Sequence, residues 1–300
     1  ENLMMIGHAS VGTKGLGDYP RATTHFEAAL DIARVADLQW HIGPTLLGLD
    51  HVRACTGQYG AAWTGLQQTL LWLESLKQVR YQLIAYDFIG HLLLDLGLNT
   101  LAVTHLQRGL DLGHATGVIF WQATLGANLC IAESRLGETG HLPRLLGMLE
   151  QTRQSSERYM TLRCLEGMAE LALTAGDVEH CEEAADELLG MAIHDGLKEM
   201  EGVARRWRGE ARYLKGDLAA SHAELVLAAG LAGETGRVRL QIDIELALAR
   251  SCSAQGKHDQ ARQHHDRAQR ISLLVTESLA GSELHSPLLA GRTGAQAWLQ

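Results

Sequence analysis

The sequence predicts an all-α fold in which seven antiparallel helical hairpins stack into a solenoid. Three observations predict it: a glycine recurs about every 40 residues, apolar side chains keep helical spacing between these glycines, and the 300 residues hold 32 glycines but only 4 prolines. Proline disrupts helix interiors, whereas glycine accepts the left-handed backbone of tight turns. The apolar share of 46% is enough to bury a large core, which excludes wholesale disorder.

Seven glycines mark the same turn in successive units and stand 40, 40, 40, 39, 40 and 40 residues apart. They are Gly17, Gly57, Gly97, Gly137, Gly176, Gly216 and Gly256. Two columns of mostly small residues keep this spacing, one seven residues before each glycine and one five residues after it. Small residues let helices approach closely, and Asp50 is the exception in the first column. A single hairpin cannot bury its own apolar face, so the units must stack.

Each unit is predicted to hold a first helix of about 16 residues before the turn glycine and a second helix of similar length after it. In the first unit, the second helix carries apolar residues at helical spacing over 25–34, and the third unit repeats this pattern over 104–112. The fourth unit departs from the pattern, with Leu142 in the small column, and the large apolar column ends at His265 in the seventh. The seven units account for residues 1–279, and residues 280–300 form a tail or cap.

The turns between units carry their own signals. A second glycine follows the first by 20 residues in three units, at Gly117, Gly196 and Gly236. An aspartate directly after the turn glycine is expected to cap the second helix, because its carboxylate can accept hydrogen bonds from the free N–H groups there. The capping residues are Asp18, Asp177 and Asp217.

The sequence segments around the turn glycines resemble the tetratricopeptide repeat. The pattern of that repeat runs from a small residue to Gly-Asp-Tyr, then to an alanine and an aromatic residue. The best copy here is Ser10, Gly17-Asp18-Tyr19, Ala22, Phe26 and Ala29. The family period is about 34 residues, so the units here are elongated. The resemblance implies a right-handed superhelix, a curved slab of helices each roughly 25 Å long. It also implies that the first helices line a concave face that binds a protein or peptide.

Long-period arrays of this kind look like the C-terminal regions of bacterial signal-transduction ATPases that are linked to nucleotide cyclase or transcription-regulator domains. The segment from Ala268 to Leu284 is similar to the one that closes such arrays. The resemblance implies a protein-interaction scaffold and regulatory arm with no cofactor and no catalytic site. The alternative is a small-molecule sensor domain that controls such a protein through an effector. Because the chain opens at Glu1 without an initiator methionine, we expect it to be a piece of a longer protein.

Charge and cysteine content narrow the partners and the compartment. The net charge is −9, and acidic residues are in slight excess in both halves of the chain, so the basic stripe of a nucleic-acid-binding protein is missing. No apolar run approaches the roughly 18 residues of a membrane span, and no signal peptide is visible. The 5 cysteines are scattered without a Cys-x-x-Cys pair, which favours reduced, buried thiols in the cytoplasm over a disulfide framework or a zinc knuckle.

Chemical motifs are weak. Residues 7–14 approach a phosphate-binding loop, but Thr13 and Lys14 stand in reversed order, so no nucleotide site is expected. No Gly-x-Ser-x-Gly nucleophile motif occurs. His51, Asp87 and His91 could share one surface, either as metal ligands or as polar groove residues. A zinc site needs three or four organised ligands, so the groove interpretation is favoured and no metal is predicted.

Inward positions on the first helices, counted from the turn glycines, predict the partner-binding groove. The groove residues are His51, Asp87, His91, Arg163, Glu166, Glu170, Arg206, Glu210 and Arg250. Two interpretations stay open for the charged half of this set. Its side chains bind a partner, or Glu170 with Arg206 and Glu210 with Arg250 form inter-repeat salt bridges of about 0–1 kcal/mol each. Aromatic residues near the starts of first helices either pack on the preceding unit or offer a ligand platform; they are Trp40, Tyr81, Trp121 and Tyr159.

Overall fold

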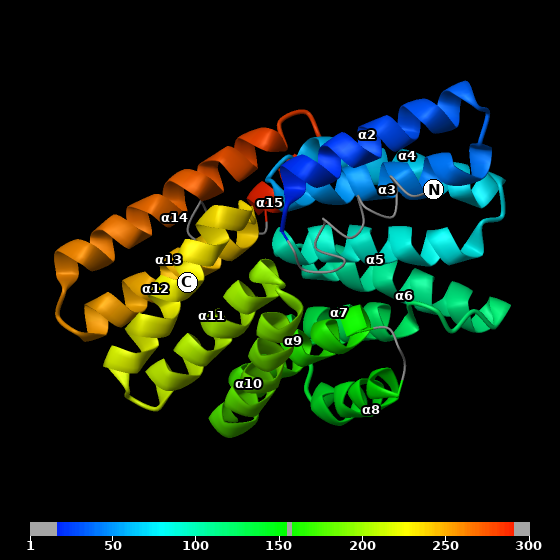
Figure 1. Ribbon diagram of the computed structural model, residues 1–300. Coiled ribbons are helices and arrows are strands. Elements are labelled where there is room, and N and C mark those ends of the chain that lie inside the picture. Colours follow the sequence, from blue (N-terminus) through cyan, green and yellow to red (C-terminus); the bar gives the residue numbers. More distant parts are fainter. Residues whose placement is uncertain (1–16, 155–157, 291–300) are drawn as a thin grey trace.

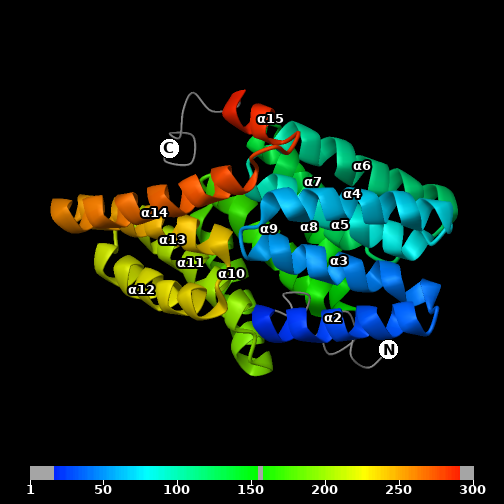
Figure 2. The same ribbon diagram turned by 90° about the horizontal axis from the view of Figure 1, so that it is seen from above.

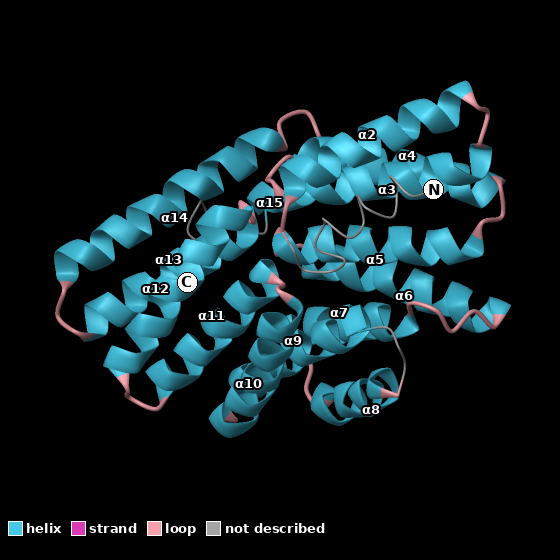
Figure 3. Ribbon diagram, in the orientation of Figure 1, coloured by secondary structure: helices cyan, strands magenta, loops and turns pink. Residues whose placement is uncertain are grey.

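The computed structural model describes residues 17–154 and 158–290, and all regular structure in these ranges is helical (Figure 3). The helices are α2 (Tyr19–Val35), α3 (Gln39–Cys55), α4 (Tyr59–Ser75), α5 (Val79–Asp95), α6 (Asn99–Thr116), α7 (Gln122–Arg135), α8 (His141–Arg153), α9 (Arg158–Thr174), α10 (Val178–Asp195), α11 (Lys198–Leu214), α12 (Leu218–Thr235), α13 (Val238–Ala254), α14 (His258–Ser278) and α15 (His285–Ala290). The first helix of the first predicted hairpin and the rejected phosphate-binding motif at residues 7–14 lie outside the described residues. The prediction of an all-α solenoid is confirmed.

Each hairpin packs against the next through its first helix. From α2 to α14, consecutive helices contact one another, and α3, α5, α7, α9, α11 and α13 also contact one another in that order. These first helices therefore form the inner layer of the solenoid, and the second helices lie outside them. Figure 1 shows the N-terminal hairpins on one side, the C-terminal hairpins on the other, and α7 to α10 joining them below.

The predicted turn chemistry is present. All seven turn glycines have positive φ, from 69° at Gly17 to 91° at Gly137, and the three second-turn glycines do as well. A side chain other than hydrogen is strained in this conformation, which is why glycine recurs there. The three predicted caps are confirmed, since the aspartate carboxylates accept hydrogen bonds from the N–H groups of Arg21, His180 and Ala220 at 3.0–3.2 Å.

Two turns between units use a strained residue where other units use glycine. Asp37 and Lys77 have φ of 50° and 54°, and each stands 20 residues after a turn glycine, the place that Gly117 holds in the third unit. Such a conformation is unfavourable for a residue with a Cβ by roughly 1–2 kcal/mol. The superhelix therefore imposes the turn geometry even where the residue does not favour it.

Replacing Lys77 with glycine should raise the free energy of unfolding by about 1 kcal/mol, because the left-handed backbone strain is removed. Urea unfolding followed by circular dichroism measures the change. Lys77→Ala is the control, since it removes the side chain but keeps the Cβ. A Lys77→Gly variant no more stable than Lys77→Ala would contradict the strain that we assign to this turn.

The small columns hold the closest helix contacts. Ala22, Ala62 and Ala102 are fully buried, and a Cβ added to Gly90 would lie 2.3 Å from a Leu106 methyl carbon. Asp50, the exception in its column, is also buried and faces Gly65, where an added Cβ would meet its carboxylate. Burial raises the pKa of Asp50 to about 7, although Arg53 opposes this shift. The column thus tolerates a carboxyl group only because a glycine opposes it.

The solenoid curls until its ends meet (Figures 1 and 2). Helix α14 contacts α4, and an added Cβ at Gly60 would lie 2.3 Å from the carbonyl oxygen of Ser278. The indole N–H of Trp63 donates a hydrogen bond of 2.8 Å to Glu283, in the segment that precedes α15. We call these contacts between α2–α5 and α11–α15 the closure. The curved array that the repeat pattern predicts therefore closes on itself.

Candidate functional site

The closure surrounds a charged cavity of about 60 Å³. All its lining residues come from first helices, except Arg237, the residue that caps the N-terminus of α13. Five arginines and five carboxylates balance one another in the lining: Arg135, Arg163, Arg206, Arg237 and Arg239 with Asp95, Glu166, Glu170, Glu199 and Asp243. Charges withdrawn from water need such partners, since an unpaired buried charge is strongly unfavourable.

Arg237 joins the two ends of the solenoid. Its Nη2 donates a hydrogen bond of 2.8 Å to Asp95 on α5 and lies 3.3 Å from His91 Nε2, while its Nε lies 3.4 Å from a Glu199 oxygen. Tyr19, on α2, donates its hydroxyl proton to Glu199 at 2.5 Å. Burial raises the pKa of Glu199, and Arg237 and the Tyr19 hydroxyl oppose this shift. The closure therefore contains a buried charge network that spans more than 140 residues of sequence.

Asp95 receives a further contact at the same end of α5. The backbone carbonyl oxygen of Asp95 accepts a hydrogen bond of 2.8 Å from Arg239 Nη1. Carbonyl groups in the last turn of a helix lack partners within the helix, and a cation there also complements the helix dipole. Arg239, near the start of α13, thus supplies a hydrogen-bond donor to the free carbonyl group at the end of α5.

A second network lies between α7 and α9. Arg135 forms two hydrogen bonds with the Glu170 carboxylate, at 2.6 and 3.0 Å, and donates another to the Leu94 carbonyl oxygen at 2.9 Å. Burial by itself would raise the pKa of Glu170, but the Arg135 guanidinium outweighs this and holds the pKa below its usual value. Glu170 is therefore ionised and firmly held.

Arg163 and Asp87 occupy a third, deeper network. Arg163 pairs with Glu166 and donates a hydrogen bond of 2.6 Å to Asn128. Asn128 in turn donates to Asp87 at 2.8 Å, and the Trp121 indole N–H donates to the other Asp87 oxygen at the same distance. Burial raises the pKa of Asp87 to about 6, against the effect of these two donors.

Arg206 is the most weakly held of the cavity arginines. It lies 3.4 Å from Asp243 and over the ring of Trp207, 4.0 Å from its centroid. Asp243 has a closer partner in Arg239, at 2.8 Å. The Nε group of Arg206 and the Nη1 group of Arg237 are buried, and neither has a hydrogen-bond partner among the described residues. Such unsatisfied donors are rare in proteins and favour an added acceptor.

The two histidines border the cavity without forming a metal site with Asp87. His51 stacks on Phe88 with ring centroids 4.3 Å apart, and its ring lies 6.2 Å from that of His91. The pKa of His91 is held well below its usual value by burial and by Arg163 and Arg237, so the ring is neutral at pH 7 and accepts from Arg237. The Asp87 carboxylate accepts hydrogen bonds from Trp121 and Asn128, and among the described residues it does not form a group with His51 and His91 at metal-ligand spacing.

The structure brings six of the nine predicted groove residues to the cavity: His51, His91, Arg163, Glu166, Glu170 and Arg206. Asp87 is buried but does not line the cavity, and neither do Glu210 and Arg250. These last two form the inter-repeat ion pair that one interpretation predicts, at 2.5 Å. Glu170 and Arg206 do not pair with one another, because Arg135 and Asp243 are their partners.

The recurring aromatic residues have different surroundings. Trp121 is buried and stacks on Tyr159, with ring centroids 5.5 Å apart, and Tyr159 borders the cavity. Trp40, by contrast, is 65% exposed. Packing accounts for Trp121, whereas the largely exposed Trp40 has no ring-stacking contact with another described residue.

Sequence reasoning missed the other half of the cavity. The missed residues are Asp95, Arg135, Glu199, Arg237, Arg239 and Asp243. One signal was available, since Asp95 and Arg135 each stand two residues before a turn glycine, in the last turn of a first helix. The others lie near the starts of α11 and α13, and they reach the cavity only because the solenoid closes.

Solved structures with this fold are known. The chain is similar to a Rap protein complexed with competence and sporulation factor, with 16% identity and a TM-score of 0.67 over 92% of this chain and 75% of that one. It is similar to NprR in complex with its cognate peptide NprX, with 13% identity and a TM-score of 0.61 over 94% and 89% of the two chains. At these identities the similarity shows the fold, which is that of tetratricopeptide-type repeat proteins.

A third similar structure is a Signal Transduction ATPase with Numerous Domains from Pyrococcus horikoshii, which carries a tetratricopeptide repeat sensor. Identity is 13% and the TM-score is 0.52, over 94% of this chain and 49% of that chain. No protein-family model matches the sequence, and no curated protein matches it. Among the described residues, no helix has the length and apolar character needed to cross a membrane.

Proposed function

We propose that this chain is a non-enzymatic, cytoplasmic interaction scaffold, a regulatory arm of a larger bacterial signalling protein that binds a protein or peptide on its concave face. The observation that carries the proposal is the cavity, where two buried guanidinium N–H groups lack an acceptor among the described residues. A carboxylate of the partner, from an acidic side chain or a C-terminus, would supply that acceptor through charge-assisted hydrogen bonds.

The size of the cavity favours a peptide group over a whole metabolite. Its volume of about 60 Å³ accommodates a carboxylate but is far below the roughly 300–1,000 Å³ of pockets that enclose small ligands. Two of the similar structures are complexes with a factor or a peptide, which is consistent with this interpretation. The alternative function, a small-molecule sensor, would require the closed array to open further.

Replacing Arg206 with alanine should weaken binding of the partner peptide at least tenfold, because one charge-assisted hydrogen bond is lost. Arg206 is the suitable position, since Asp243 keeps Arg239 as its partner and the fold is retained. The test has two steps. Partners are captured from bacterial lysate by immobilised protein, and synthetic acidic peptides from a captured protein are then titrated by fluorescence anisotropy, each with and without its carboxylates.

Arg250→Ala is the matched control, because Arg250 also lies on a first helix and is ion-paired, but outside the cavity. Its affinity for the peptide should stay within about twofold of the wild type. An equal loss of peptide affinity in Arg206→Ala and Arg250→Ala would contradict the proposed site. Peptide binding that does not depend on the carboxylates of the peptide would contradict it too. A metabolite that stabilises the protein in a thermal-shift screen, with no peptide bound, would favour the sensor.

A further inference from the structure

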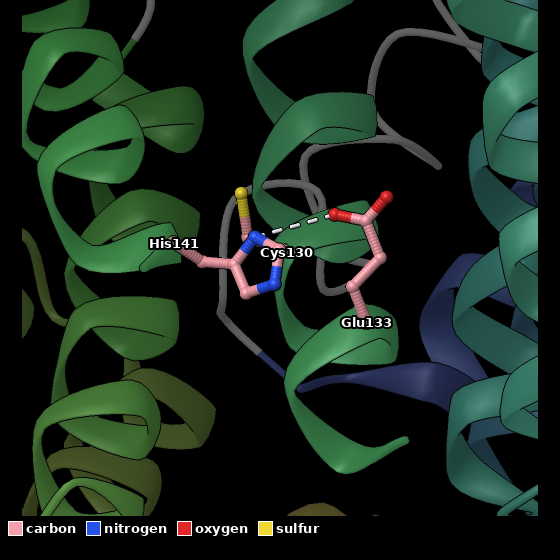
Figure 4. Close-up of side chains that lie close together, drawn as sticks. All are labelled: Cys130, Glu133 and His141. Atoms are coloured by element: carbon pink, nitrogen blue, oxygen red, sulfur yellow. Dashed lines mark ion pairs between the residues drawn. The ribbon is translucent and has the colours of Figure 1, made fainter. Parts of the chain in front are cut away.

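A cysteine, a glutamate and a histidine converge at the turn of the fourth hairpin (Figure 4). Cys130 and Glu133 lie three residues apart on α7, and His141 is the first residue of α8. One ligand atom from each lies within 4.8 Å of the other two, and His141 Nδ1 lies 3.3 Å from Glu133 Oε2. No other group of three such side chains at this spacing occurs among the described residues.

We propose that Cys130, Glu133 and His141 bind a zinc ion, which holds α7 and α8 together. Ligand atoms on a tetrahedral zinc, at roughly 2.0–2.3 Å from the metal, are about 3.3–3.6 Å apart. The His141–Glu133 distance already fits this spacing, and the thiol needs to approach by roughly 1.2–1.5 Å at most. One sulfur, one nitrogen and one oxygen ligand suit zinc, and a water completes the four positions.

The Glu133 carboxylate of the cluster is poorly satisfied as it stands. Its Oε2 atom is buried and has no hydrogen-bond partner of good geometry among the described residues. The cationic neighbour of the carboxylate, Arg144, is 3.5 Å away, and its side chain is 47% exposed. It can move into solvent when a metal takes its place beside Glu133, as exposed ion pairs are weak.

The place in the fold gives the site a role. Helices α7 and α8 have 14 and 13 residues, against 17 or more in the helices of the other hairpins, and α8 buries only Leu145, Leu149 and Thr152. Their turn carries two left-handed glycines, Gly137 and Gly140. A metal across this turn would stabilise the hairpin whose two helices contact one another least, in the way that structural zinc adds folding free energy.

The test is a zinc titration of the metal-free protein, in competition with a chromophoric chelator. Wild type should bind one zinc ion, and Cys130→Ala and His141→Gln should each weaken that binding at least 100-fold. Alanine occupies the same column at Ala169, so the Cys130 variant is expected to fold. Cobalt should give a thiolate charge-transfer band with the wild type and none with Cys130→Ala.

Two controls separate this site from chance binding. Cys164→Ala removes another buried thiol, and His180→Gln removes a histidine that pairs with Asp177 at 2.7 Å but has no thiol beside it. Both should bind zinc as the wild type does. Arg144→Ala should bind more tightly by about threefold or more, because a competing cation is removed. Equal zinc affinity in the wild type and Cys130→Ala, or no stoichiometric binding at all, would overturn the proposal.

Discussion

Replacing Arg237 with alanine should lower the free energy of unfolding by about 3–5 kcal/mol, the range for breaking a buried ion pair from one side. The variant leaves Asp95 without its 2.8 Å partner and Glu199 without its cation, both in buried positions. Urea unfolding followed by circular dichroism measures the loss. Because these contacts join the ends of the solenoid, small-angle scattering should also show a larger radius of gyration.

Two further variants test this interpretation. Arg239→Ala should lower the free energy of unfolding by less, about 1 kcal/mol. The Arg239 side chain is 23% exposed, and Asp243 keeps Arg206 nearby. The double variant Arg237→Ala with Asp95→Ala should lose less than the sum of the single losses, because neither charge is then stranded. A loss below about 1 kcal/mol in Arg237→Ala would contradict a stabilising role for the closure network.

A methyl group at Gly60 should destabilise the protein by about 1–3 kcal/mol, as overpacking does elsewhere. The added Cβ in Gly60→Ala would lie 2.3 Å from the Ser278 carbonyl oxygen, a backbone atom that cannot rotate away. Helix α14 must then move away from α4, which weakens the Trp63–Glu283 hydrogen bond and the packing of Leu279. Amide hydrogen exchange in the C-terminal part of α14 should be faster.

Gly230→Ala is the matched control, since Gly230 is also helical and an added Cβ there meets nothing within 4 Å. Alanine favours the helix over glycine by roughly 0.5–1 kcal/mol, so this variant should be more stable than the wild type. The same Gly→Ala substitution is therefore expected to lower the free energy of unfolding at Gly60 and to raise it at Gly230. A stabilised Gly60→Ala protein would show that α4 and α14 are not in close contact.

The closure also bears on how a partner would reach the cavity. In the closed array the charged lining is bordered by contacts such as Tyr19–Glu199 and Arg237–Asp95. A partner must compete with these contacts or bind when they are broken. Variants that weaken the closure but keep Arg206 would change how readily a partner enters the cavity. They would leave its recognition by Arg206 unchanged, so the two effects can be measured apart.

The sequence by itself determined the parts of this protein that depend on local structure. A 40-residue period with left-handed glycines defines where helices end, and aspartates such as Asp177 cap the next helix through contacts three residues apart. The same spacing predicts the inward side of each first helix, and His91, Arg163 and Arg206, which it selects, line the cavity. The turns and the inward helix positions recur with the 40-residue period, so the periodicity of the sequence reveals them.

Only the tertiary structure decided how far the solenoid curls and what closes it. Small rotations at each repeat add up over six described hairpins, and no single repeat records their sum. Arg237 meets Asp95 across 142 residues, and Tyr19 meets Glu199 across 180, at distances unrelated to the 40-residue period. The buried charges of Arg237 and Asp95 persist there because each has the other as its partner from the opposite end of the array. That pairing depends on the geometry of the whole chain and leaves no periodic mark in the sequence.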